Sequence, residues 1–268
     1  MILVQDICYK LHIMKEMRDK INQLLFKLPR EIVITSSWLH NHGISYRMLH
    51  HHSCSDSSIL ENIGAGAYVI GGQRENLQIS GGLFSLQTQL NIKFHIGALS
   101  SLENGHSSRH FVTFNDSSLE IFLDENRKFP KWFGGTFKGK YRLFQTRFLN
   151  TDVGLQNANF QGFDLRVSCV ERAVLEAIFL NSLSLREIAQ IMEMLTNLRP
   201  KILQDLLENC SSIRVKRVFL YLAEKQKHSW FDFLDLSRIN LGKGKRVISN
   251  SGKLDKKYGI VIEDLDEI

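Results

Sequence analysis

Apolar residues recur at spacings of three and four along the N-terminal part of the chain. They are Ile7, Leu11, Met14, Met17, Ile21, Leu24 and Leu28. This period places them on one face of a helix, which ends before Pro29 because proline cannot donate the helical hydrogen bond. The pattern predicts an amphipathic helix that packs on its own domain, and a role in pairing two chains is the alternative.

The next apolar positions predict two short helices separated by a tight turn. Residues 32–34 are β-prone, and the hydroxyl side chains that follow them can accept the free amides of a helix start. We expect this helix over residues 36–42, ending at Gly43 because glycine readily adopts the left-handed turn conformation. A second helix is expected over residues 45–52. The arrangement is typical of a helix-turn-helix, whose second helix reads DNA.

Two further β-prone runs, 59–63 and 67–70, flank the sequence Gly64-Ala65-Gly66. Short strands on either side of a glycine turn predict a hairpin, and a hairpin directly after a helix-turn-helix forms its wing. Residues 31–70 are therefore predicted to be a winged helix-turn-helix that binds operator DNA. Arg47 is expected at a base edge and Ser45 or Tyr46 at a phosphate. The full set of expected DNA contacts is Ser45, Tyr46, Arg47, His50, His51 and Gly66.

The rest of the chain alternates between strand-like and helical patterns. Residues 77–90 suit a helix, whereas the short apolar runs of 95–114 do not separate helix from strand. Strand-like segments are 111–114, 118–123 and 141–149, and helical segments are 170–181, 185–196 and 200–209. We predict an α+β protein, with a winged helix-turn-helix domain at residues 1–95 packed against a larger mixed α/β domain at residues 96–268.

Composition changes this picture little. The 268 residues favour two domains, and 43% hydrophobic with 23% charged residues is ordinary for a globular protein. The sequence contains no membrane-length apolar run and no N-terminal signal-peptide pattern. Its cysteines are widely scattered, which indicates reduced thiols. These features predict a cytoplasmic protein without a membrane partner.

Positive charge concentrates near the C-terminus. Residues 199–257 contain 14 lysines and arginines against 6 aspartates and glutamates, whereas the whole chain carries a net charge of +6. The alternation over residues 212–223 predicts a basic face, able to meet phosphates or an acidic protein, and an ordinary solvated surface is the alternative. The surface residues singled out are Arg199, Arg214, Lys216, Arg217, Lys243, Lys245 and Arg246.

Sequence motifs give no positive support for an enzyme. The run Leu241–Arg246 reads L-G-K-G-K-R, which lacks the spacing and the hydroxyl residue of a phosphate-binding loop. Residues 50–52 are three adjacent histidines, which cannot converge on one metal ion from a helix. We therefore expect no catalytic residues, no cofactor and no metal. A nuclease or nucleotide-processing activity in the second domain is the enzymatic alternative.

Taken together, these segments resemble the AbiEi antitoxin family of bacterial type IV toxin-antitoxin systems. The resemblance runs through R-E-I-V-I-T-S-S-W-L-H-N-H-G-I-S at residues 30–45, I-L-E-N-I-G-A-G-A-Y at 59–68 and H-I-G-A-L-S-S-L-E-N-G-H at 95–106. Its most specific part is V-S-C-V-E-R-A-V-L-E at 167–176, followed by residues 196–224 and 239–261. The wing turn departs from the family pattern, because its middle residue, Ala65, is not basic.

This resemblance implies a function for each domain. The winged helix-turn-helix would act as a transcriptional regulator that represses its own operon. The C-terminal antitoxin domain would oppose a co-encoded AbiEii-type nucleotidyltransferase toxin, without forming a stable complex with it. The basic surface falls inside this domain. A stand-alone transcriptional regulator without a toxin partner is the alternative.

Overall fold

The computed structural model describes residues 18–46, 49, 59–104, 118–124, 127–249 and 252–263. The chain forms two compact units. The N-terminal unit comprises Met1–Ile92, Phe129–Lys138 and Gln161–Phe163. The C-terminal unit comprises Lys93–Lys128, Gly139–Phe160 and Asp164–Ile268. The chain therefore leaves the N-terminal unit after Ile92 and returns to it twice.

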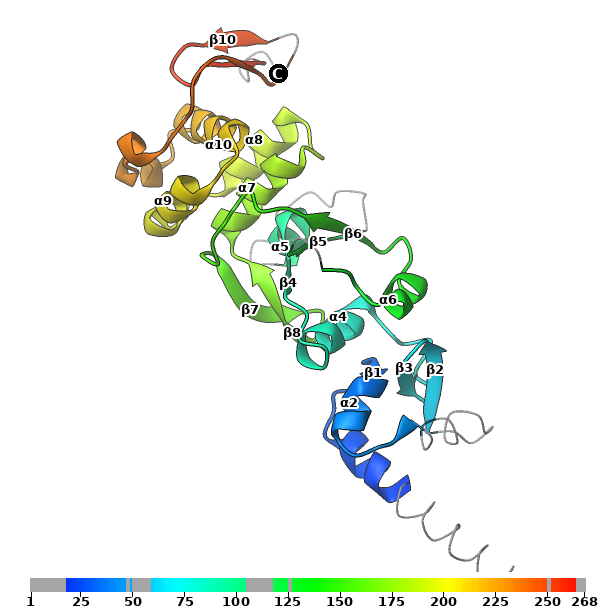
Figure 1. Ribbon diagram of the computed structural model, residues 1–268. Helices are drawn as coiled ribbons and strands as arrows, with labels where there is room; N and C mark the ends of the chain where they lie inside the picture. Colours follow the sequence, from blue (N-terminus) through cyan, green and yellow to red (C-terminus); the bar gives the residue numbers. More distant parts are fainter. Residues whose placement is uncertain are drawn as a thin grey trace, which may run out of the picture. The chain divides into compact units, whose positions relative to one another are not determined.

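The N-terminal unit contains a three-stranded sheet in the order β1-β3-β2 (Figure 1). Its elements are β1 (Ile34–Thr35), α2 (Ser36–Asn41), β2 (Leu60–Gly64), β3 (Ala67–Ile70), α4 (Ile79–Thr88) and α6 (Lys131–Thr136). Residues 18–26 are helical, and Ile21 and Leu25 are buried. The predicted helix is thus confirmed over its described part, as are α2, α4 and the antiparallel β2–β3 hairpin.

The turn after α2 has the predicted form. The Thr35 hydroxyl accepts the Trp38 amide at the helix start, which satisfies one of the free donors there. Gly43 adopts a φ of 80°, and the Ile44 amide donates to the Leu39 carbonyl at 3.0 Å. The Ile44 side chain is 1% exposed and fills the core beneath the turn. A residue with a Cβ atom would strain this backbone at position 43.

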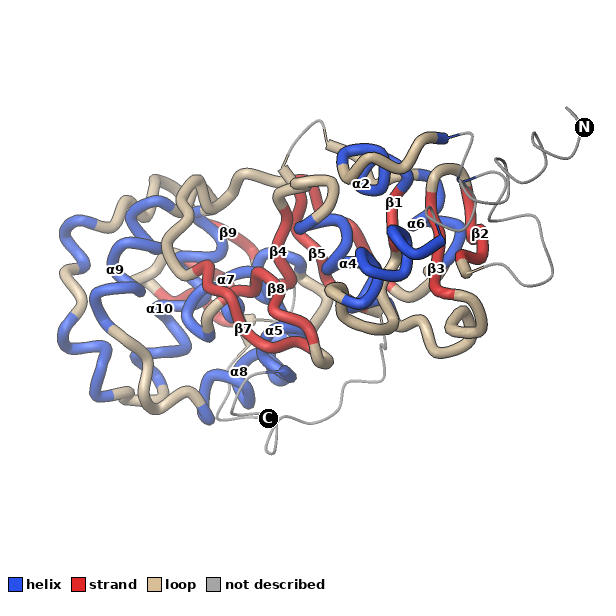
Figure 2. The backbone as a smooth tube through the Cα atoms, turned by 90° about the horizontal axis from the view of Figure 1, so that it is seen from below, coloured by secondary structure: helices blue, strands red, loops and turns tan. Residues whose placement is uncertain are grey.

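The C-terminal unit is built on a five-stranded sheet in the order β6-β5-β4-β8-β7, seen from another direction in Figure 2. The strands are β4 (Phe94–Ile96), β5 (Leu119–Leu123), β6 (Tyr141–Gln145), β7 (Leu155–Phe160) and β8 (Phe163–Ser168). β4 runs antiparallel to β5 and parallel to β8, and β5 runs parallel to β6. The ambiguous segment 95–114 begins as strand and continues into α5 (Ala98–Asn104). The strand predicted for 141–149 ends at Gln145, and residues 111–114 lie outside the described part.

Four helices and a second small sheet complete the C-terminal unit among the described residues. The helices are α7 (Val170–Leu180), α8 (Leu185–Met194), α9 (Pro200–Asn209) and α10 (Ile213–Lys225), followed by the 3-10 turns η1 (Ser229–Phe233) and η2 (Leu236–Arg238). The small sheet contains β9 (Arg246–Val247), β10 (Lys253–Asp255) and β11 (Ile260–Ile262) in the order β10-β11-β9. The predicted helices at 170–181, 185–196 and 200–209 are confirmed. No helix in the described ranges is long and apolar enough to cross a membrane.

Candidate functional site

Within the predicted recognition helix the structure describes Ser45, Tyr46 and Leu49. The Leu49 amide donates to the Ser45 carbonyl at 3.1 Å, and the Leu49 side chain is buried. Tyr46 is 57% exposed, and its ring stacks on His40 from α2 with the centroids 5.1 Å apart. Tyr46 is therefore positioned on the outer surface beside α2. The predicted contact residues Arg47, His50 and His51 lie outside the described residues.

The hairpin turn that follows packs closely on its own unit. The Gly66 carbonyl accepts the Ser36 amide at 2.8 Å, which ties the turn to the start of α2. A Cβ atom at Gly64 would come within 2.8 Å of the Trp132 Cβ atom in α6. Ala65, between the two glycines, is exposed. The turn is thus fixed in position, and a contact from Gly66 to a DNA phosphate would use its amide, because phosphate oxygens only accept hydrogen bonds.

Gly66→Ala is expected to destabilise the N-terminal unit by about 2 to 3 kcal/mol. Gly66 has a φ of 74°, and an added Cβ atom would lie 2.8 Å from the Ser36 Oγ atom. Gly72→Ala is the matched control, because Gly72 has a φ of 78° and no atom within 4 Å of an added Cβ. The control isolates the backbone strain, about 1 kcal/mol. Urea denaturation should separate the two variants, and equal losses would contradict the close packing at the turn.

The structure corrects the predicted basic face over residues 212–223. This stretch lies in α10, where every residue from Val215 to Ala223 is buried. Lys216 is 3% exposed and Arg217 is 4% exposed, so neither lies on the surface. Burial lowers the pKa of both side chains. Alternating basic residues predicted a solvated face, but here both faces of the helix are covered by the unit.

Arg217 is not part of the predicted basic surface; its side chain holds a neighbouring loop in place. Its guanidinium donates to the carbonyls of Leu241 at 2.8 Å, Gly244 at 2.7 Å and Gly259 at 3.0 Å. A fourth bond reaches the Gly242 carbonyl at 3.3 Å. These bonds hold the basic loop, residues 242–246, in which Lys243, Lys245 and Arg246 are all exposed. Part of the exposed positive charge predicted for the C-terminal domain therefore lies in this loop.

Arg199 and Arg214 also have partners within the unit. Arg199 forms a forked pair with the buried Glu171, at 2.9 Å from Nε and 2.8 Å from Nη2. Burial opposes the ionisation of Glu171, but the hydrogen bonds from Arg199 outweigh it and lower the Glu171 pKa to about 2. Half-buried Arg214 donates to the Ile178 carbonyl and to the Asn181 side chain at the end of α7. Both arginines thus stabilise the fold at these positions.

A buried carboxylate, Glu176, organises the centre of the C-terminal unit, and sequence patterns did not point to it. Its side chain is fully buried in α7 and accepts hydrogen bonds from His95, Ser168 and Arg172 at 2.8 to 2.9 Å, and from the Ala98 amide at 3.0 Å. These bonds join β4, β8, α7 and the start of α5. In the part of the chain that the structure describes, no group of three or more His, Cys, Asp or Glu residues is arranged to hold a metal ion.

Comparisons with known proteins place this fold in context. A family model described as transcriptional regulator, AbiEi antitoxin, type IV toxin-antitoxin system matches residues 116–263, and the model for its N-terminal domain matches residues 17–114. Among solved structures, the crystal structure of the RV2827C protein from Mycobacterium tuberculosis is similar, with a TM-score of 0.56 and 11% identity. That similarity covers 90% of this chain and 89% of the other, and it concerns the fold alone. No curated protein sequence matches the chain.

Proposed function

The chain belongs to the AbiEi antitoxin family of type IV toxin-antitoxin transcriptional regulators, and from this premise we propose that it represses its own operon and neutralises a co-encoded toxin. The observation that carries the proposal is the match of both family models along the chain. Repression is assigned to the N-terminal unit and neutralisation to the C-terminal unit. The toxin is proposed to be an AbiEii-type nucleotidyltransferase that forms no stable complex with this chain.

The geometry of the N-terminal unit supports DNA binding. The helix-turn-helix turn at Gly43 and the hairpin fixed to Ser36 are the parts that orient a recognition helix on the major groove. Tyr46 stands exposed at the start of that helix, where it can reach a phosphate. Ser45 is proposed as a second phosphate contact, Arg47 as the base-reading residue, and His50, His51 and the Gly66 amide as supporting contacts.

In the C-terminal unit the basic loop is the proposed antitoxin surface. Lys243, Lys245 and Arg246 are exposed, and the Lys253 and Lys256 side chains nearby in sequence are exposed as well. A loop held by a buried arginine presents these charges without a large loss of conformational freedom on binding. An acidic protein face or a phosphate-bearing molecule fits this charge. Arg199 and Arg214 are at least partly exposed and are included in the proposed surface. Lys216 and Arg217 are buried, so they are not part of the contact surface itself.

A separation-of-function experiment tests both assignments in the full-length chain. The chain is co-expressed with the neighbouring toxin gene, and growth is measured together with a reporter driven by the operon's promoter. The triple variant Lys243→Ala, Lys245→Ala, Arg246→Ala is expected to lose growth rescue and to keep repression. Arg47→Ala is expected to lose repression and, with expression from an independent promoter, to keep rescue.

The matched control removes the same charge elsewhere on the C-terminal unit. Lys201, Lys225 and Lys227 are exposed, and their replacement by alanine should leave both readouts unchanged. Loss of rescue in this control as well would show a dependence on total charge and would contradict the assignment to the basic loop. If the chain represses its own promoter but its gene has no toxin gene beside it, the second candidate, a stand-alone regulator, would be favoured.

A further inference from the structure

A cavity of about 420 Å³ opens at one end of the five-stranded sheet, entirely within the C-terminal unit. Its floor comes from the start of β4 and the end of β5, which lie side by side because Phe94 pairs with Leu123. The segment between β6 and β7 forms one wall, and Arg166 from β8 and Arg172 from α7 form another. Ligand-binding cavities in proteins commonly have this size.

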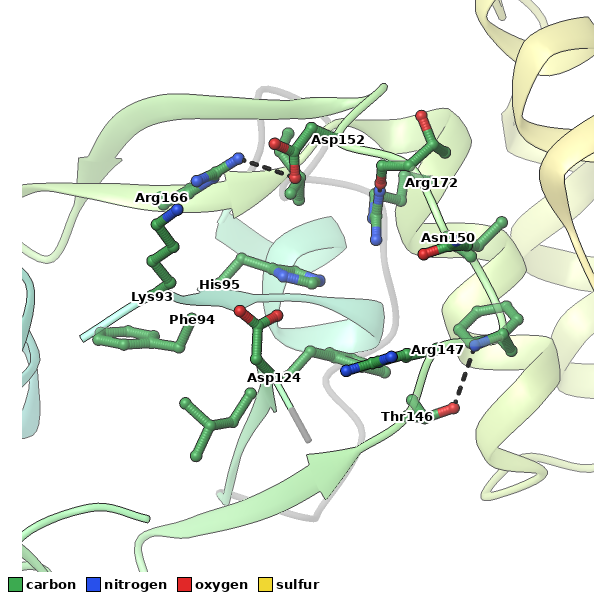
Figure 3. A pocket seen from close by; sticks show the side chains of 16 residues that line it. Lys93, Phe94, His95, Asp124, Thr146, Arg147, Asn150, Asp152, Arg166 and Arg172 are labelled. Atoms are coloured by element: carbon green, nitrogen blue, oxygen red, sulfur yellow. Dashed lines mark hydrogen bonds and ion pairs between the residues drawn. The ribbon is translucent and has the colours of Figure 1, made fainter. Parts of the chain in front are cut away.

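Positive side chains surround the cavity. Lys93, Arg147, Arg166 and Arg172 line it, against the two carboxylates Asp124 and Asp152. Figure 3 shows the four cationic side chains around a common space, with His95 between them. Asp152 forms an ion pair with Arg166 at 3.2 Å. The lining therefore has an excess of positive charge, which favours an anionic ligand.

The inner wall is formed before any ligand binds. Arg172 is 5% exposed, and its guanidinium is fixed by Glu176 at 2.8 Å and by the carbonyls of Thr151 at 2.6 Å and Val153 at 2.9 Å. Its Nη2 group takes part in none of these bonds. His95 is held by Glu176 and stacked on Phe122 with the ring planes 6° apart. Donors fixed in this way lose little conformational entropy when a ligand arrives.

The wall between β6 and β7 is also held in place. The Phe148 carbonyl accepts the Ser211 amide at 2.8 Å, and Leu149 forms a β-bridge with Cys210. These contacts anchor the segment that carries Arg147 and Asn150 to the junction of α9 and α10. Arg147 and Asn150 are exposed at the mouth of the cavity, so they can meet a ligand without rearrangement of the wall.

We propose that this cavity binds the phosphate group of a small organic molecule, which the known family function does not require. The forked donors of arginine match the oxygens of phosphate. Inorganic phosphate alone is far smaller than 420 Å³, so the remaining space accommodates an organic part. Phe94, Phe148 and Leu155 offer that part apolar contact, and the Asp124 carboxylate and the Asn150 amide can accept hydrogen bonds from its hydroxyl or amino groups.

Isothermal titration of the full-length chain with AMP, ribose 5-phosphate and inorganic phosphate tests this site. At least one of the two organic phosphates is expected to bind saturably, at least about tenfold more tightly than inorganic phosphate. The double variant Lys93→Ala, Arg147→Ala is expected to weaken that binding by at least about tenfold, because both side chains line the cavity from exposed positions. Lys201→Ala, an exposed lysine outside the cavity, is the control and should bind as the parent does.

Several outcomes would overturn the proposal. One is the absence of saturable binding by either organic phosphate up to about 10 mM. Another is binding that the double variant leaves unchanged, since the ligand would then occupy a different place. If inorganic phosphate bound as tightly as the organic phosphates, the cavity would not contact the organic part of the ligand as proposed. Circular dichroism of the double variant confirms that any loss of affinity is not a loss of fold.

Discussion

Glu176→Gln is expected to lower the free energy of unfolding by about 3 to 5 kcal/mol. The Glu176 carboxylate is fully buried and is bonded to His95, Ser168, Arg172 and the Ala98 amide. Burial alone would raise its pKa, but the charges of His95 and Arg172 and the hydrogen bonds lower it. A neutral amide keeps the shape, yet leaves the buried Arg172 guanidinium without its counter-charge. The amide NH2 group of the glutamine would also face hydrogen-bond donors, because both carboxylate oxygens of Glu176 accept hydrogen bonds.

Urea denaturation at neutral pH measures this loss, with Glu193→Gln as the control. Glu193 lies in α8 and is exposed, so its replacement should change stability by less than about 0.5 kcal/mol. The lowered pKa of Glu176 means that its contribution is present above the unfolded-state pKa and is lost as the pH falls through the folded-state value. The difference between the parent and Glu176→Gln should therefore shrink in acid. A loss below about 1 kcal/mol at neutral pH would contradict the central role of this carboxylate.

Arg217→Ala is expected to destabilise the C-terminal unit by about 2 to 4 kcal/mol and to release the basic loop. The substitution removes the donors from four carbonyls, those of Leu241, Gly242, Gly244 and Gly259. The rate of amide hydrogen exchange over residues 241–246 should rise by more than the global loss of stability explains. Growth rescue of toxin-expressing cells should also fall. Arg217→Lys is expected to recover only part of the loss, because one ammonium group cannot replace the guanidinium fork.

Arg246→Ala separates this structural effect from a loss of charge. Arg246 is exposed, and its Nη1 group donates a hydrogen bond to the neighbouring Lys245 carbonyl at 3.2 Å. Its removal takes away the same charge with little expected change in stability. Unchanged exchange in the loop of Arg217→Ala, or equal destabilisation by both variants, would contradict the fastening role of Arg217.

Features that depend on neighbouring residues could be predicted from the sequence. The Thr35 cap and the glycine at 43 define the ends of α2 within a few positions, and the hairpin follows from its glycine turn. The helix α8 begins with a capping box between Ser184 and Glu187, and α9 has Pro200 at its first position. Each of these signals acts within one turn of backbone, so a local pattern is sufficient to identify it.

Features that depend on distant residues could not be predicted. Arg217 binds carbonyls 24 to 42 residues further along the chain, so its alternation with apolar neighbours resembled that of a solvated face. Glu176 bonds His95 across 81 residues, and no spacing in the sequence marks that pair. The cavity likewise draws its cationic side chains from four separate places: the residue before β4, the loop after β6, the strand β8 and the helix α7. Such sites arise from the order of strands in the sheet, which local patterns do not specify.

Binding of the full-length chain to DNA from its own promoter tests the proposed function most directly. Fluorescence anisotropy titrations compare that DNA with a scrambled duplex of the same length, at several salt concentrations. We expect binding of the promoter at least about 1,000-fold tighter than the scrambled duplex at physiological salt, with affinity that falls as salt rises. Arg47→Ala should weaken promoter binding by about 1 to 3 kcal/mol. Equal affinity for both duplexes, or no binding of either, would contradict a promoter-specific regulator.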